Sequence, residues 1–169
     1  MHSTAGERVP VGTPRPASPQ MGRPAGPLPV GKLLLSVAAL VPAVGAVVAD
    51  WSPTHLGNPR WPPHAKFHTA QTITTAAELA GLGLWQLWGP GQADGSRLRW
   101  AALFGGLYWL TAAPAILFPG TAFVDPDAPV RPTVWRGIPV NQVTLQAAVL
   151  LPLLAAGYAL ATRQLRRRP

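Results

Sequence analysis

Three of the four histidines in this chain lie within one short segment that also carries a carboxylate and is dense in tryptophan and proline. The segment reads DWSPTH over residues 50–55 and NPRWPPHAKFH over residues 58–68. Imidazole changes charge near neutral pH and is a common metal ligand, so histidines beside a carboxylate suit proton transfer or metal binding. An ordinary loop has no physical need for this composition. The segment is therefore the first candidate for a functional site.

The prolines of this segment indicate where the next helix begins. Pro62 and Pro63 suit a first helical turn, where the backbone N–H has no partner in any case. A helix is therefore expected to start near His64. From that start, polar residues recur at intervals of three and four positions and share one helical face. They are His64, His68, Gln71, Thr75 and Glu78.

Two histidines on this face are one helical turn apart. Imidazoles at positions i and i+4 can bind the same divalent metal ion, so His64 and His68 are candidate metal ligands. His55 or Asp50 is available as a third ligand. The alternative is structural, with the histidines capping the helix, bonding loop carbonyls or lying among lipid headgroups. Because no further motif accompanies this spacing, both interpretations stay open.

Three ionisable residues are candidates for catalysis: His68 as an acid or base, with Asp50 and Glu78 as carboxylates. On a regular helix Glu78 lies about 21 Å from His64 along the axis, near the membrane centre if the helix spans a bilayer. An ionisable group at that depth is a functional candidate by default. The alternatives are a protonated Glu78 bonded to a neighbouring helix, and an Asp50 that caps its helix or pairs with a basic neighbour.

Apolar segments must position these residues. A membrane-spanning helix needs about 20 mainly apolar residues. Four segments approach that length, and they cover residues 30–49, 67–88, 98–118 and 140–161. The expected fold is all-α, a bundle of four transmembrane helices with antiparallel neighbours that occupies residues 30–169. The Pro-rich segment 1–29 has too little aliphatic content to form a core and is expected to be a disordered cytoplasmic tail.

The composition favours a membrane protein. Charged residues make up 12% of the chain and hydrophobic residues 48%, whereas soluble domains have about 25% charged residues. Most of the basic residues behind the net charge of +8 flank the apolar segments. The expected partner is therefore membrane lipid with its anionic surface, and not nucleic acid. The chain has no cysteine, which excludes disulfides and thiolate metal sites within it.

Basic residues also predict the orientation. With four spans, one side receives the N-terminal tail, the loop of residues 89–97 and the C-terminal tail, and this side holds ten Lys and Arg residues against four on the other. Both termini are therefore expected in the cytoplasm, with the plasma (inner) membrane as the location. A cleaved signal peptide is the alternative for the first segment, but its apolar run exceeds the about 7–15 residues of a signal sequence.

The fourth segment is polar at the same level as the second. Its outer half is crowded with polar residues, whereas residues 149–161 are almost wholly apolar. The polar residues are Asn141, Gln142, Thr144 and Gln146. Two helices that are polar in the same leaflet are expected to face each other, because polar side chains avoid lipid. The sequence thus predicts a polar cavity in the outer half of the bundle, with Asp50 near its mouth. Its predicted ligand-binding residues are His55, His64, Gln71, Thr75, Asn141 and Gln142.

The run from Asp50 to His68 resembles the signature of an uncharacterised family of small four-helix integral membrane proteins in bacteria and fungi. That signature is DWxxTH followed by NPxWPPHAxFH. The resemblance in sequence covers this segment and its two flanking helices. The rest of the chain resembles the family only in its architecture. It implies a membrane protein and no established reaction.

A more distant likeness is to the EXPERA group, which includes the emopamil-binding sterol isomerase and the sigma-2 receptor. It rests on four helices, an acidic residue that ends the first (Asp50) and a glutamate within the second (Glu78). In that group such carboxylates line a pocket for sterols or cationic amphiphiles, which implies a lipid pocket here. The pattern departs from the group because Glu78 lies 16 residues after Pro62, and because the two helical histidines have no clear counterpart.

Two functions follow as hypotheses. The first is a pocket that binds or transforms a lipid-like or sterol-like small molecule, with a divalent metal as a possible cofactor. The second is a structural or accessory membrane protein whose polar residues only pack helices. The first predicts a cavity, and the second predicts direct side-chain pairing without a void.

Overall fold

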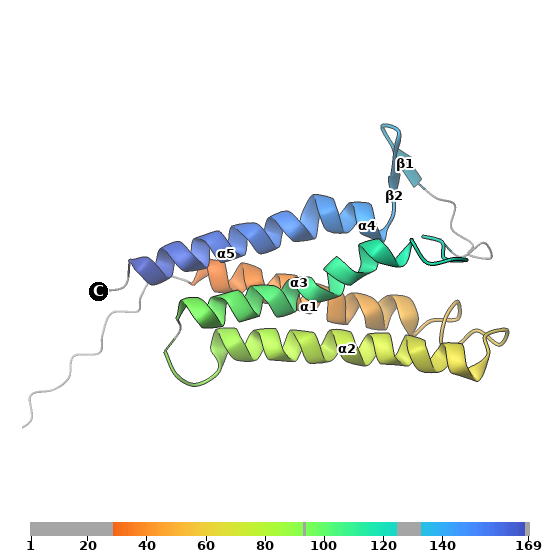
Figure 1. Ribbon diagram of the computed structural model, residues 1–169, viewed down its shortest axis with the longest axis horizontal. Coiled ribbons are helices and arrows are strands. Elements are labelled where there is room, and N and C mark those ends of the chain that lie inside the picture. Colours follow the sequence, from red (N-terminus) through yellow and green to blue (C-terminus); the bar gives the residue numbers. More distant parts are fainter. Residues whose placement is uncertain (1–28, 93, 125–132, 168–169) are drawn as a thin grey trace, which may run out of the picture.

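The computed structural model describes residues 29–92, 94–124 and 133–167, so the predicted N-terminal tail lies outside the described residues except for Pro29. The described chain is mainly helical. Helices α1 (Val30–Asp50), α2 (Pro63–Trp88) and α3 (Gly95–Ala115) alternate in direction, as Figure 1 shows. A last helical rod is continuous through α4 (Gln142–Leu145), the π-helical turn η1 (Gln146–Leu150) and α5 (Leu151–Arg166), and runs beside α1.

Helix α1 contacts each of the other three rods, and small residues make these contacts possible. Ala38, Ala39 and Ala46 of α1 are buried, as are Ala76 and Ala80 of α2. Small side chains let helix backbones approach closely, which is how helices commonly associate in a membrane, where burial from water no longer drives packing. The largest fully buried side chains lie towards one end of the molecule and are Leu35, Leu87 and Leu98.

That end is also held by polar contacts between α1 and α2. The Lys32 ammonium donates to the carbonyl of Leu87 and lies 4.9 Å from the centre of the Trp88 ring. The indole of Trp88 in turn donates to the hydroxyl of Ser36 at 2.8 Å. The start of α1, the end of α2, the start of α3 and the end of α5 all meet at this end (Figure 1).

Helix boundaries differ from the predicted spans at several points. Helix α2 begins at Pro63, four residues before the predicted span of 67–88, because the two prolines open its first turn. Helix α3 ends at Ala115, short of the predicted residue 118. Pro114 lies in its last turn, and the chain then tightens into turns in which Leu117 N donates to Pro114 O at 3.0 Å.

A small hairpin departs from the all-α expectation. Strand β1 (Thr133–Trp135) pairs antiparallel with β2 (Ile138–Val140), so the predicted fourth span, 140–161, begins too early and the helix starts at Gln142. The two linking residues, Arg136 and Gly137, have φ angles of 49° and 82°. Positive φ at both central residues is the backbone of a tight two-residue hairpin turn.

In the described residues, two helical segments are long and apolar enough to cross a membrane: Val30–Asp50 and Gln142–Arg166. The first and last of the four predicted spans therefore agree with this composition and length. Helices α2 and α3 are more polar. Four transmembrane helices remain a prediction.

Candidate functional site

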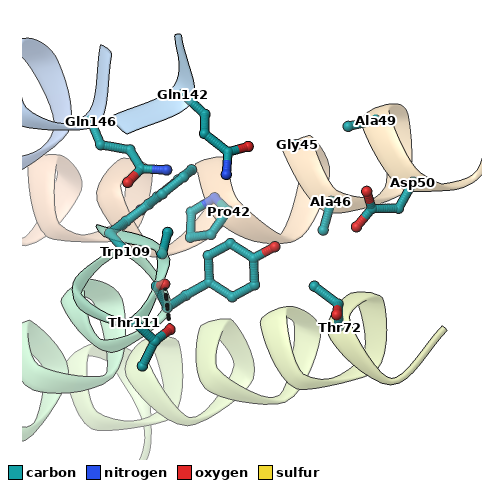
Figure 2. Close-up of a pocket in the computed structure, with 12 residues that line it drawn as sticks. Pro42, Gly45, Ala46, Ala49, Asp50, Thr72, Trp109, Thr111, Gln142 and Gln146 are labelled. Carbon is teal, nitrogen blue, oxygen red and sulfur yellow. Dashed lines mark hydrogen bonds between the residues drawn. The ribbon is translucent and has the colours of Figure 1, made fainter. Parts of the chain in front are cut away.

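A half-open cavity of about 390 Å³ lies between α1, α3 and the α4–η1 segment. Its α1 wall consists of Pro42, Gly45, Ala46, Ala49 and Asp50, as Figure 2 shows. Gly45 has no side chain, Ala46 and Ala49 have only a Cβ atom, and Pro42 has its compact ring. The space therefore exists because α1 presents small apolar residues at this level.

The opposite wall of the cavity is polar. Gln142 and Gln146 reach the cavity from α4 and η1 (Figure 2). Gln146 is only 5% exposed, whereas Gln142 is exposed. The Nε1 atom of Trp109, which also lines the cavity, is buried and has no hydrogen-bond partner within the described residues. A buried polar atom without a partner costs about 1–3 kcal/mol, so this indole favours a partner inside the cavity.

The third polar element is Asp50, where α1 ends and the 51–62 segment begins. Its carboxylate interacts electrostatically with Tyr108, another lining residue. Its Oδ1 also lies 3.9 Å from Nε2 of His55. The Nδ1 atom of the same imidazole lies 2.9 Å from the hydroxyl of Thr54. One imidazole thus lies between a hydroxyl at hydrogen-bond distance and a carboxylate at ion-pair distance.

The segment that follows α1 holds His55 in place. The edge of the His55 ring meets Trp61, with ring centres 5.1 Å apart. Asn58 is 6% exposed, donates from its side-chain amide to Thr54 O at 3.3 Å, and accepts from Arg60 N at 2.9 Å. A buried asparagine that satisfies its own loop explains why the segment is compact. The predicted meeting of His55 and Asp50 is therefore observed.

The predicted polar face of α2 lies elsewhere. His64, His68, Gln71, Thr75 and Glu78 are all exposed, and none lines the cavity. This corrects the expectation that α2 and the last helix turn their polar faces towards each other. The physical reason is that α2 packs through its buried face, in which three of the four residues are small. That face consists of Ala76, Ala80, Gly83 and Leu87.

From α2 only Thr72 reaches the cavity (Figure 2). Asn141, a predicted ligand-binding residue, has a structural task instead. Its Oδ1 accepts from the backbone N–H groups of Val143 and Thr144 at 3.0 Å each, and so caps α4. Gln142 alone among the six predicted ligand-binding residues lines the cavity, and Asp50 alone among the three catalytic candidates.

The three histidines predicted to share a metal lie in two separate places. His55 faces Asp50, whereas Nε2 of His64 lies 3.1 Å from Nε2 of His68. In the described part of the chain, no group of three or more His, Cys, Asp or Glu residues is placed to hold a metal ion. The predicted set of His55, His64 and His68 is therefore not assembled around one point.

Sequence reasoning missed Tyr108 and Trp109 as cavity residues, whereas Gln146 belongs to the polar half of the last helix from which the cavity was predicted. One signal could have found Trp109. Six of the seven tryptophans fall near the ends of the predicted spans, where indoles prefer the membrane interface, and Trp109 falls within one. A tryptophan away from the interface needs a partner for its N–H, which points to a polar environment inside the protein.

Comparison with known proteins places the chain in a family without assigning it a reaction. No match was found among curated proteins or among solved structures. Residues 34–169 match a family of unknown function, DUF6640, and the match runs from α1 beyond the end of α5. This agrees with the expectation of an uncharacterised family, and the chain belongs to DUF6640.

Proposed function

We propose that this chain is an integral membrane protein with four transmembrane helices whose cavity binds a lipid-like small molecule. The observation that carries the proposal is the cavity itself, which combines a mainly apolar α1 wall with polar side chains and a buried Trp109 Nε1 that has no partner within the described residues. Its volume of about 390 Å³ falls within the range of about 300–1,000 Å³ typical of small-molecule sites. The structural alternative predicts side chains that pair directly and leave no void.

The packing of the rods supports membrane insertion of all four. Helix α1 has 21 residues and is therefore about 31 Å long, close to the thickness of a bilayer core. Helix α2 packs against α1, and α3 packs against both. If α1 crosses the bilayer, its neighbours must lie within it too. Exposed tryptophans near both ends of the rods support this, because indoles prefer the membrane interface: Trp51, Trp85, Trp88, Trp100 and Trp135.

The end that gathers the α1 start and the α5 end faces the cytoplasm in this proposal. In the described residues it carries more basic side chains than the other end, which matches the positive-inside rule. They are Lys32, Arg97, Arg99, Arg163, Arg166 and Arg167, against Arg60, Lys66 and Arg136. The cavity then opens in the outer half of the plasma membrane.

The polar groups define the chemistry of the ligand. Asp50 offers an acceptor, the indole of Trp109 offers a donor, and the amides of Gln142 and Gln146 offer both. A hydroxyl or amide on an apolar skeleton is complementary to these groups, because it can donate to the carboxylate and accept from the indole. Of the two carboxylates on which the distant likeness to the EXPERA group rests, only Asp50 lines the cavity. Any reaction of the ligand would fall to Asp50 and His55, since His68 and Glu78 lie outside the cavity.

A pair of glycine substitutions tests the proposal. Gly45 lines the cavity, and a Cβ added there meets no atom within 4 Å, so Gly45→Leu can begin without a clash and place its side chain in the cavity. Gly81 of α2 has the same free space but lies away from the cavity, which makes Gly81→Leu the matched control.

The measurement is mass spectrometry of lipid that co-purifies with the full-length chain in detergent. The native chain and Gly81→Leu should retain one enriched lipid class, and Gly45→Leu should lose it. If all three proteins carry the same lipids in the same amounts, the cavity does not hold a ligand and the structural alternative stands.

A further inference from the structure

A pair of neighbouring imidazoles lies outside the cavity, on the first turns of α2. His64 and His68 stand one turn apart on the exposed face of the helix, with their rings nearly perpendicular at 81°. Their Nε2 atoms lie 3.1 Å from each other. Both side chains are exposed, so the pair is accessible to a solute ion without any rearrangement of the fold.

The hydrogen bond to Gln71 determines which nitrogen of His68 carries a proton. Nδ1 of His68 lies 3.2 Å from Oε1 of Gln71. An amide oxygen only accepts, so Nδ1 must carry the hydrogen and donate it. In the neutral imidazole the lone pair is then on Nε2, which faces His64. A glutamine one turn along the helix thus prepares His68 as a ligand through the nitrogen that meets its neighbour.

The spacing of the two Nε2 atoms suits one metal ion. Bonds of about 2.0–2.1 Å at a tetrahedral angle separate two nitrogens on zinc by about 3.3 Å. The observed 3.1 Å is close to this value, and two exposed side chains can absorb the difference by small rotations. A cation can therefore take the place of the hydrogen between the two nitrogens, provided that His64 changes tautomer and carries its hydrogen on Nδ1. The Gln71 contact would serve as the outer-shell hydrogen bond that metal-binding histidines usually make.

We propose that His64 and His68 form a two-nitrogen binding site for a divalent transition-metal ion such as Zn²⁺, Ni²⁺ or Cu²⁺, with Gln71 as the residue that orients His68. Imidazole ligands suit these ions, whereas Mg²⁺ and Ca²⁺ require oxygen ligands. The described residues supply no third His, Cys, Asp or Glu to this point. The remaining coordination positions are therefore open to water or to a small external ligand. This site is independent of the proposed lipid cavity.

The experiment is a titration of the purified full-length chain with Zn²⁺, followed by calorimetry. The native chain should bind one ion, and His64→Ala or His68→Ala should each abolish tight binding because a single exposed imidazole remains. Gln71→Leu should weaken binding about 10-fold, at the lower end of the effect of losing an outer-shell partner. His55→Ala is the matched control, because this histidine pairs with Asp50 and not with the other two.

Spectroscopy of the Cu²⁺-loaded chain adds a readout of the ligands themselves. The electron paramagnetic resonance spectrum should show coupling to two nitrogens in the native chain and in His55→Ala, and to fewer in His68→Ala. The proposal is overturned if the native chain binds no Zn²⁺, or if His55→Ala weakens binding as much as His68→Ala does. A stoichiometry of one ion per two chains would also overturn it, since that result means a closed site with four imidazoles.

Discussion

A close approach between two helices gives a sharp test of how the fold is held. Gly31 lies against the backbone of Ala161 where α1 meets α5. A Cβ atom added at Gly31 would lie 2.1 Å from the nitrogen of Ala161 and 2.5 Å from its Cα. Non-bonded carbon atoms need about 3.5 Å. In Gly31→Ala the two helices must therefore separate by about 1 Å, because backbone atoms cannot turn aside as a side chain can.

The magnitude follows from two opposing terms. Overpacking costs about 1–3 kcal/mol, and a contact with backbone belongs in the upper part of that range. Replacing glycine by alanine in a helix returns up to about 1 kcal/mol. The free energy of unfolding should therefore fall by about 1–2 kcal/mol, which lowers the melting temperature by about 2–8 °C for a chain of this size.

Thermal unfolding in detergent, followed by circular dichroism, measures the change. Gly45→Ala is the control on the same helix, since its new Cβ meets nothing within 4 Å. This variant should gain about 0.5–1 kcal/mol from helix propensity alone. If Gly31→Ala melts at or above the temperature of the native chain, α1 and α5 do not approach at Gly31 as described.

Three further outcomes are expected. The Arg97 guanidinium donates to the carbonyls of Gln86, Pro90 and Trp85 at 2.9, 2.6 and 2.7 Å, so Arg97→Gln should lower the free energy of unfolding by about 1.5–3 kcal/mol. The exposed Arg99 is its control, and Arg99→Gln should change stability by less than about 0.5 kcal/mol in a denaturation experiment. Asn141→Ala should cost about 1 kcal/mol, and Asn141→Ser should retain most of the cap; an equal loss in both would contradict the capping role. Because the chain has no native cysteine, Asp94→Cys provides a single labelling site; it should react with an impermeant reagent only in inside-out vesicles, and labelling of intact cells would reverse the proposed orientation.

Much of the α-helical frame could be predicted from the sequence. The first span, 30–49, differs from α1 by one residue, because an apolar run of the right length ends at an aspartate. Pro62 and Pro63 located the start of α2, since proline fits a first helical turn. The contact of Asp50 with His55 was also predictable, because only four residues separate them at a helix end.

The direction in which α2 faces could not be predicted from its polar pattern. Helical spacing shows which residues share a face but not which neighbour they meet. In a soluble protein the polar face of a helix points to water. Within a bilayer a helix meets lipid or other helices, so the polar pattern alone does not predict its orientation. The more useful signal was the small-residue series at Ala76, Ala80 and Gly83, because small residues mark helix contacts there. The hairpin at residues 133–140 was missed because its strands are only three residues long and lie almost wholly in the loop predicted between spans 98–118 and 140–161.

The π-helical turn η1 divides the last rod into two parts with different phases. Each residue of an α-helix advances the side chains by about 100°, and a π-helical turn takes up roughly one extra residue. Deleting one residue of η1, such as Ala147, would therefore let the rod run as an uninterrupted α-helix. Because the removed residue and the restored α-helical advance compensate, Gln142 would keep its direction relative to Gly157, which packs against Leu34 and Leu35. Family members that lack one residue at this turn should accordingly keep both the cavity wall and the α1–α5 contact. A one-residue deletion between η1 and Gly157 would instead rotate Gln142 by about 100° and change which residues line the cavity.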